Sequence, residues 1–219
     1  MSTYPYDAVH AHTMFSIGWV MLAAKQMNIP VRVSHAHSAL INGKSLMKSI
    51  YESVMRCLIL AYSTDLVACG EKAGQRLYGK SAYKKRGKLI LNGVNTEEYR
   101  FSEEKRYIIR NQLNLQNNFV LGHTGRLADI KNQSFLIELM PELLKKREDA
   151  KLILLGDGDD REMLEEKVNA LNLKDNVIFA GSVCNVQDYL SAMDVFVFPS
   201  LYEGMPLSIL EVQANGLPC

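Results

Sequence analysis

The sequence lacks long apolar runs and an excess of charge of either sign. Its longest apolar stretch, residues 17–24, is far short of the roughly 18 to 20 residues that a membrane-spanning helix needs, and the first seven residues show no basic region followed by an apolar run. The 25 Lys and Arg balance 24 Asp and Glu, for a formal net charge of +1, which gives no field to hold a polyanionic nucleic acid. These absences predict a chain that is neither secreted nor membrane-spanning and has no nucleic-acid partner.

Cysteine is also scarce. The four cysteines lie far apart and form no CxxC pair, a spacing that fits neither a disulfide framework nor a zinc ribbon and suits a reducing compartment. We therefore expect a cytoplasmic protein. The composition, 47% hydrophobic and 22% charged over 219 residues, excludes disorder, collagen and coiled coil and suffices for a sizeable globular core.

Short apolar runs of strand length recur along the chain. These runs, rich in Val, Ile and Leu, occupy residues 7–12, 31–37, 65–70, 88–93, 119–126, 151–158, 176–181 and 195–200. Apolar residues at helical spacing lie between many of them, at residues 15–23, 46–58, 135–143, 163–171 and 186–193. Strands this apolar are typical of parallel sheets that are covered on both faces. The alternation therefore predicts an α/β fold.

The interval from Asn95 to Asn118 is charged and has only scattered apolar residues, so we expect a domain boundary inside or beside it. Two α/β domains result, residues 1–98 and 99–219. Because ligands of open α/β sheets bind beyond the carboxyl ends of the strands, the residues after each predicted strand are the candidates for chemistry.

The first candidate follows the predicted strand at 119–124. Gly125 and Arg126 come first, and Lys131 lies where a helix is expected to begin. Two cations would then lie beside the positive end of a helix dipole, an arrangement that binds anions. A solvated loop before a helix is the alternative.

The second candidate is the sequence GDGDDR at residues 156–161. It resembles a dinucleotide fingerprint, but the third glycine position holds Arg161, so the fingerprint fails. A tight turn with Asp159 or Asp160 capping the next helix is as consistent with these residues as ligand contact is.

The third candidate is a strand-to-helix turn at residues 199–211. Pro206 is predicted at the first position of a helix that ends near Gly216, and the free amides of that helix could bind a phosphate. Glu203 in the turn and Glu211 about one turn into the helix could bind vicinal sugar hydroxyls. Alternatively, Glu203 caps the helix and Glu211 is an ordinary surface residue.

Histidines end two predicted strands of the first domain. His10 and His12 lie at one strand end, and His35 and His37 at another. Alternate residues on a strand share a face, so each pair could chelate a metal ion. No third acidic or cysteine ligand is evident at a useful spacing, and we expect no metal; hydrogen bonding to a polar substrate and a structural role are the alternatives.

A basic stretch covers residues 76–88. We expect it to be a solvated loop. The alternative is a patch that meets anionic lipid headgroups, helped by the preceding apolar helix with Lys44 and Lys48.

Together these motifs resemble the retaining glycosyltransferases of family 4, whose GT-B architecture has two Rossmann-like domains facing each other. The most specific motif is PSLYEGMPLSILE, which is similar to the E-x7-E element of that family, and it is followed by QANGLPC. Further similar motifs are GRL followed by KN, LLGDGDDR, VIFAGSV and NGV, while VHAHT and VRVSHAHS resemble the branch that builds bacterial capsular and exopolysaccharide repeat units. The resemblance covers nearly the whole chain and implies a middle segment, truncated at both ends, that lacks the units expected before Tyr6 and after Cys219.

The resemblance also implies roles for particular residues. Arg126 and Lys131 would bind the donor diphosphate, Glu211 the ribose hydroxyls, and Glu203 with the amides of 204–207 the donor sugar and phosphates. The implied catalytic residues are His35, which matches the active-site histidine of the family, with Glu203, Arg126 and Lys131. The implied donor-binding residues are Gly125, Arg126, Lys131, Gly156, Val183, Glu203, Gly204, Met205, Leu207 and Glu211.

The implied reaction is transfer of a sugar from a nucleotide-sugar, with a UDP-sugar favoured, to a lipid-linked or saccharide acceptor with retention of anomeric configuration. It needs no cofactor and no obligatory divalent metal, since cations and helix-start amides stabilise the leaving group. The acceptor implies peripheral contact with the inner face of the plasma membrane. The alternatives are a nucleotide-sugar 2-epimerase of the same architecture and a non-catalytic nucleotide-sugar-binding fragment.

Overall fold

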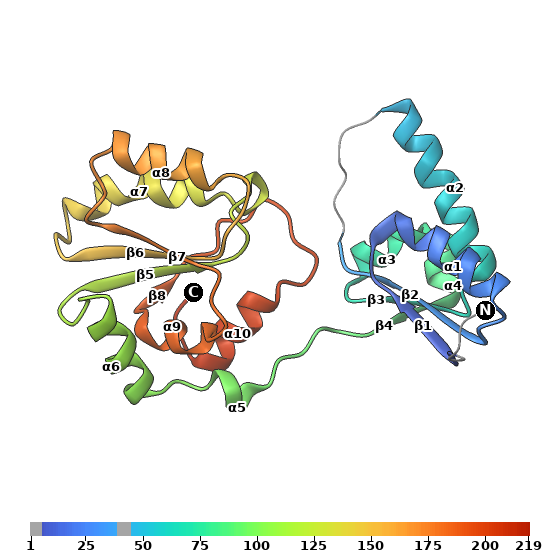
Figure 1. Ribbon diagram of the computed structural model, residues 1–219, viewed down its shortest axis with the longest axis horizontal. Coiled ribbons are helices and arrows are strands. Elements are labelled where there is room, and N and C mark those ends of the chain that lie inside the picture. Colours follow the sequence, from blue (N-terminus) through green and yellow to red (C-terminus); the bar gives the residue numbers. More distant parts are fainter. Residues whose placement is uncertain (1–5, 39–44) are drawn as a thin grey trace. The chain divides into compact units, whose positions relative to one another are not determined.

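A computed structural model describes residues 6–38 and 45–219 (Figure 1). The chain folds into two compact units. The first comprises residues up to Asn92 together with Tyr202–Met205, and the second comprises Gly93–Leu201 and Pro206–Cys219. The division after Asn92 lies six residues before the boundary expected after residue 98.

The first unit is built on a parallel sheet with strand order β1-β2-β3-β4. Its strands are β1 (Ala8–Ala11), β2 (Val31–Ala36), β3 (Asp65–Ala68) and β4 (Gly87–Leu89), and its helices are η1 (Met14–Ser16), α1 (Ile17–Gln26), α2 (Leu46–Tyr62), α3 (Glu71–Tyr78) and α4 (Lys80–Arg86). Each strand lies within or beside an apolar run of the sequence, which confirms the predicted α/β fold for this unit.

The core of the first unit contains a buried tyrosine. The hydroxyl of Tyr78 lies 2.7 Å from the carbonyl oxygens of both Ser34 and Val67, so it bonds to the backbone of β2 and β3. Burial raises the pKa of Tyr78 to about 12. The neutral hydroxyl therefore ties α3 to two neighbouring strands over the whole physiological pH range.

The prediction of a solvated loop over residues 76–88 is wrong, because most of this stretch forms the helix α4. Its basic residues concentrate in the last turn, where cations interact favourably with the helix dipole. Arg86 also donates hydrogen bonds to the carbonyl oxygens of Leu60 and Ser63 at the end of α2. The polar composition of this stretch favours a loop, but the favourable charges at the helix end and the tertiary hydrogen bonds of Arg86 stabilise the helix instead.

The second unit is built on a parallel sheet with strand order β7-β6-β5-β8. Its strands are β5 (Phe119–Thr124), β6 (Ala150–Leu155), β7 (Val177–Gly181) and β8 (Val195–Phe196), and its helices are α5 (Thr96–Tyr99), α6 (Glu103–Gln112), η2 (Asp129–Lys131), α7 (Gln133–Leu144), α8 (Arg161–Ala170), α9 (Val186–Ala192) and α10 (Leu207–Asn215). Helices α7 and α8 cover one face of the sheet, and α6, α9 and α10 lie on the other (Figure 1).

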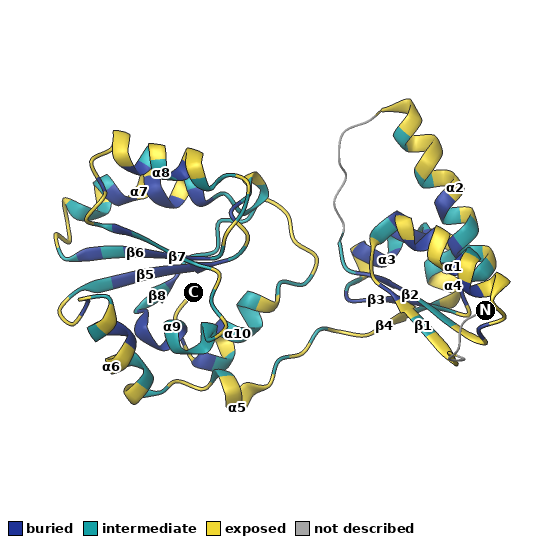
Figure 2. Ribbon diagram, viewed as in Figure 1, coloured by how far each residue is buried: buried dark blue, intermediate teal, exposed yellow. Residues whose placement is uncertain are grey.

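Strand β6 shows that both faces of this sheet are buried (Figure 2). Its residues alternate between two apolar clusters: Leu152 and Leu154 contribute to the cluster under α7 and α8, and Ile153 and Leu155 to the cluster under α9 and α10. All four side chains are almost fully buried. This confirms the parallel, doubly covered sheet that the apolar runs predict.

The charged interval 95–118 folds into helices α5 and α6 of the second unit. Arg106 and Arg110 of α6 each donate a 2.6 Å hydrogen bond to the carboxylate of Asp194, which also accepts one from the amide of Val120. The charges of this interval thus attach α6 to the residue just before β8.

Candidate functional site

In the second unit, backbone hydrogen bonds hold the carboxyl ends of three strands together. The amide of Gly125 after β5 donates to Leu155, and the amide of Gly156 after β6 donates to Gly181 of β7. Two residues further along both chain segments, the amide of Leu127 donates to the carbonyl oxygen of Asp157. These bonds fix the backbone at the ends of β5, β6 and β7, where the candidate site lies.

Two glycines of the GDGDDR motif are required by this close approach. A Cβ atom at position 156 would clash with the carbonyl oxygen of Gly125, and one at position 158 would clash with that of Leu127. Gly156 also has a φ of +127°, which side chains disfavour. The motif therefore serves the packing of two strand ends, although its dinucleotide fingerprint is incomplete.

The expected helix cap is not formed by an aspartate side chain. Asp160 occupies the N-cap position of α8 but makes no side-chain cap hydrogen bond. The carboxylate of Asp159 instead accepts a 3.0 Å hydrogen bond from Arg126. The motif thus places a carboxylate beside one of the two predicted phosphate-binding cations.

Arg126 and Lys131 both lie beyond the carboxyl end of β5. Arg126 is exposed. Lys131 is half-buried at the end of η2, with its Nζ 5.8 Å from the centre of the Phe198 ring. The aliphatic part of its side chain passes beside Gly125, within 3.5 Å of the position a Cβ would take there. The structure therefore brings Gly125 and Lys131 together, as the sequence predicts.

Glu211 lies in the middle of α10. Its carboxylate accepts a 3.1 Å hydrogen bond from the hydroxyl of Tyr99, the last residue of α5. Burial and the neighbouring Glu211 raise the pKa of Tyr99 to about 12, so the phenol keeps its proton and donates it. The helix ends at Gly216, whose φ of +79° gives the left-handed cap that was expected, but Pro206 is the N-cap and α10 begins one residue later, at Leu207.

Sequence reasoning missed Tyr99. It lies 112 residues before its partner, in the interval that reads as a charged linker. No local spacing links the two residues, and only the fold of α5 against α10 brings them together.

The remaining predicted donor residues are divided between the units. Val183 packs against the apolar cluster under α9 and α10, and Leu207 is exposed at the start of α10. Glu203, Gly204 and Met205 belong to the segment that groups with the first unit. Glu203 and Gly204 are exposed there, and Met205 is half-buried.

The first unit gathers four histidines at the carboxyl ends of β1 and β2. Nε2 of His10 lies 3.1 Å from Nδ1 of His35, and Nδ1 of His12 lies 2.7 Å from Nε2 of His37. The predicted catalytic residue His35 is buried, with 7% of its surface exposed, and its Nε2 has no hydrogen-bond partner among the described residues.

Burial is the main cause of altered histidine ionisation in this cluster. Burial, followed by the neighbouring His37, His10 and His12, lowers the pKa of His35 to about 4. Burial and the nearby imidazoles also lower the pKa values of His10 and His37. These three rings are therefore neutral at pH 7.

A cavity of about 330 Å³ opens beside these strand ends. It is lined by Met14, Phe15, Ser16, Ser38, Lys48, Tyr51, Glu52 and Arg76. Ser38 directly follows the histidine cluster in sequence. Arg76 pairs with Glu52 at 2.7 Å and lies over the ring of Phe15, 4.9 Å from its centre. This cavity combines an apolar wall with a charged pair.

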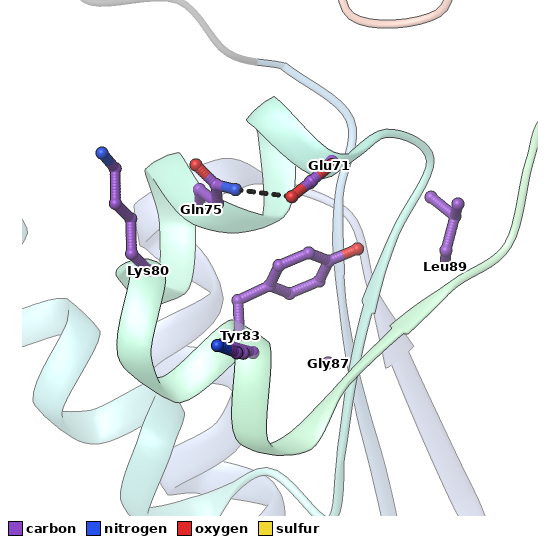
Figure 3. A pocket seen from close by; sticks show the side chains of 7 residues that line it. Glu71, Gln75, Lys80, Tyr83, Gly87 and Leu89 are labelled. Atoms are coloured by element: carbon purple, nitrogen blue, oxygen red, sulfur yellow. Dashed lines mark hydrogen bonds between the residues drawn. The ribbon is translucent and has the colours of Figure 1, made fainter.

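A larger cavity of about 610 Å³ lies between α3, α4 and β4 (Figure 3). It is lined by Glu71, Gln75, Lys80, Tyr83, Lys84, Gly87 and Leu89. The ring of Tyr83 fits there because Gly74 and Gly87 carry no Cβ, which would clash with it. None of the predicted site residues lines this cavity.

Among the described residues, no helix is both long and apolar enough to cross a membrane.

Sequence profiles of two families match the chain. Residues 1–98 match the family described as Glycosyltransferase Family 4, and residues 118–219 match Glycosyl transferases group 1. Only residues 99–117 fall outside the two matches.

Individual relatives agree with these profiles. The chain is 38% identical to the putative glycosyltransferase EpsF of Bacillus subtilis and 30% identical to the UDP-Gal:alpha-D-GlcNAc-diphosphoundecaprenol alpha-1,3-galactosyltransferase of Escherichia coli, in each case over 98% of this chain and 57% of the relative. The crystal structure of HepE from Anabaena in complex with UDP-glucose is similar with a TM-score of 0.82 and 25% identity, over 97% of this chain and 58% of HepE. The chain thus spans a little over half the length of these relatives and matches GT-B structures over that part.

Proposed function

The chain belongs to the group 1, family 4 glycosyltransferases, and from this premise we propose that it transfers a sugar from a UDP-sugar to a lipid-linked or saccharide acceptor, with retention, during bacterial polysaccharide assembly. One observation carries the proposal: Arg126 and Lys131 both follow the carboxyl end of β5, where backbone hydrogen bonds join the ends of three strands, in the same unit as Glu211. UDP-glucose is bound by HepE, and the galactosyltransferase relative is named for a UDP-sugar and a lipid-diphosphate acceptor.

The donor diphosphate would bind at the carboxyl end of β5. Arg126 is now paired with Asp159, but exposed ion pairs contribute little to stability, so a diphosphate can replace this carboxylate at small cost. Lys131 supplies a second cation from its half-buried position. Both charges would neutralise the nucleoside diphosphate as it leaves, which is where negative charge develops in the transition state. This chemistry requires no obligatory metal ion.

The ribose of the donor would bind at Glu211. A carboxylate can accept hydrogen bonds from two vicinal hydroxyls, and Tyr99 orients this carboxylate by donating to one of its oxygens. Gly125, Gly156 and the backbone at Val183 would line the nucleotide. Glu203, with the backbone of Gly204, Met205 and Leu207, would bind the donor sugar and phosphates, as the family resemblance implies.

His35 would act beside the donor sugar in the first unit. Its ring is neutral at pH 7 because burial lowers its pKa to about 4. A neutral imidazole can donate or accept one hydrogen bond to a sugar hydroxyl without adding charge near the leaving group.

The lipid-linked acceptor would bring the protein to the inner face of the plasma membrane. Helix α2 supports this because large apolar side chains are exposed along it. They are Leu46, Met47, Ile50, Tyr51 and Val54. Lys48 on the same helix and the basic end of α4 could contact anionic headgroups, whereas Lys44 lies outside the described residues. Flotation with anionic vesicles tests this contact.

A thermal unfolding panel with UDP, GDP, ADP and NAD tests the donor assignment, because a ligand that binds only the folded state raises its apparent stability. We expect UDP to raise the midpoint of the unmodified chain more than that of Glu211→Ala at the same UDP concentration. A shift with NAD alone, or an equal UDP shift in both proteins, would contradict the assignment. Sugar transfer to an acceptor then distinguishes the proposed activity from a 2-epimerase.

A further inference from the structure

The histidine cluster at the ends of β1 and β2 has the donor set of a metal site. In the parallel pair, Ala11 lies beside Ser34, so the flanking residues His10, His12 and His35 project from the same face of the sheet. One nitrogen of each of these three histidines lies within 4.8 Å of the others. The end of β1 supplies His10 and His12, and the neighbouring strand β2 supplies the third ligand, His35.

The spacing of the closest pair fits tetrahedral coordination. With zinc–nitrogen bonds of about 2.0–2.1 Å, two ligand nitrogens lie about 3.3 Å apart. Nε2 of His10 and Nδ1 of His35 are 3.1 Å apart. The 2.7 Å contact with His37 would hold the ring of His12 in place, as a second layer of hydrogen bonds does for many metal-bound histidines.

The unpartnered Nε2 of His35 points to a missing ligand. In one tautomer this nitrogen is a buried N–H without an acceptor, and in the other it is a buried lone pair without a donor. Either state costs free energy. A cation bound by Nε2 of His35 would remove this cost, whereas a cation bound by Nδ1, the nitrogen that faces His10, would fix the tautomer with the proton on Nε2.

We propose that His10, His12 and His35 form a binding site for Zn²⁺ or a similar divalent transition-metal ion. Imidazole nitrogens favour zinc, copper and nickel over magnesium and calcium. The site shares His35 with the proposed glycosyl transfer, but metal binding is measured without sugar transfer, so the two proposals can fail separately.

Metal titration of the complete chain, stripped of metal, tests this site. Zn²⁺ is titrated in competition with a chromophoric chelator, and Co²⁺ is followed by its visible absorption. Both are measured in a background in which the exposed Cys57, Cys184 and Cys219 are replaced by Ser, so that thiols do not contribute. We expect one ion per chain and the absorption of a tetrahedral, nitrogen-ligated Co²⁺.

Matched variants locate the ion. His10 and His12 are both exposed, so His10→Gln and His12→Ala should fold, which equal unfolding midpoints in chelator confirm. We expect Zn²⁺ affinity to fall at least about 10-fold in each, while the neighbouring Thr13→Ala keeps the affinity of the parent. Absence of stoichiometric binding in the parent, or parental affinity in both histidine variants, would overturn the proposal. If only one of the two histidine variants folds, lowered Zn²⁺ affinity in that variant supports the proposal and parental affinity overturns it.

Discussion

The hydroxyl of Tyr99 donates a hydrogen bond to the carboxylate of Glu211, 112 residues further along the chain. The two residues lie on α5 and α10, and the bond fixes the carboxylate that we propose to bind the donor ribose. A short helix in the charged interval thereby becomes part of the proposed nucleotide site.

Tyr99→Phe is therefore expected to weaken UDP binding. The carboxylate of Glu211 would remain but would lose one oriented hydrogen bond, so the loss should be about 0.5–1.5 kcal/mol. Isothermal titration with UDP measures it. Tyr107→Phe is the control, because Tyr107 is exposed on α6, and a similar loss in both variants would exclude a specific role for Tyr99.

Glu211→Ala and Lys131→Ala should weaken binding of different parts of the nucleotide. Each should cost about 1–3 kcal/mol of UDP affinity, the scale of a lost charge-assisted hydrogen bond. Uridine has the ribose but no phosphates, so we expect Glu211→Ala to weaken uridine binding and Lys131→Ala to leave it unchanged. Equal effects of Lys131→Ala on uridine and UDP would contradict the assignment of this lysine to the diphosphate.

Gly156→Ala should destabilise the second unit and abolish UDP binding. The added methyl group would clash with the carbonyl oxygen of Gly125 and would require a φ of +127°, which costs roughly 2–3 kcal/mol. Urea unfolding measures the loss. Gly93→Ala is the control because nothing lies within 4 Å of its Cβ position; there we expect a change within about 0.5 kcal/mol.

Asp194→Asn should destabilise the protein at neutral pH, by about 3 kcal/mol, since it leaves Arg110 without its carboxylate. Burial raises the pKa of Asp194, but hydrogen bonds from Arg106, Val120 and Arg110 outweigh it, and the folded-state pKa falls below the ordinary value of 3.8. A carboxyl group with a lowered folded pKa contributes stability above its ordinary pKa and loses it as the pH falls through the folded value.

Unfolding measured from pH 7 down to pH 2 checks the sign of this effect. The difference in stability between the parent and Asp194→Asn should be constant above about pH 5 and should shrink toward pH 2. A difference that stays the same over the whole range would show that Asp194 does not act through its charge.

Much of the fold could be predicted because the information is local. Parallel strands buried on both faces leave continuous apolar runs, and the glycine and proline residues around α10 mark its two ends. The same local information placed Gly125, Arg126 and Lys131 correctly beyond β5. Helix α4 was not predicted, because the polar sequence of this helix is stabilised by distant contacts such as those of Arg86 with the end of α2.

The missed features of the candidate site all depend on neighbours that are remote in sequence. Tyr99 becomes relevant only when α5 packs beside α10. The third histidine of the proposed metal site is brought beside the other two only when β1 pairs with β2 in the observed register. The roles proposed for Glu203 and His35 rest on the family resemblance and stay predictions.

A crystal structure of the chain with UDP would test the central claim most directly. We predict the ribose hydroxyls within hydrogen-bonding distance of the Glu211 carboxylate and the diphosphate beside Lys131 and Arg126, with the Arg126 to Asp159 ion pair opened. UDP bound away from the carboxyl ends of β5 and β6, or a ribose that does not contact Glu211, would contradict the account.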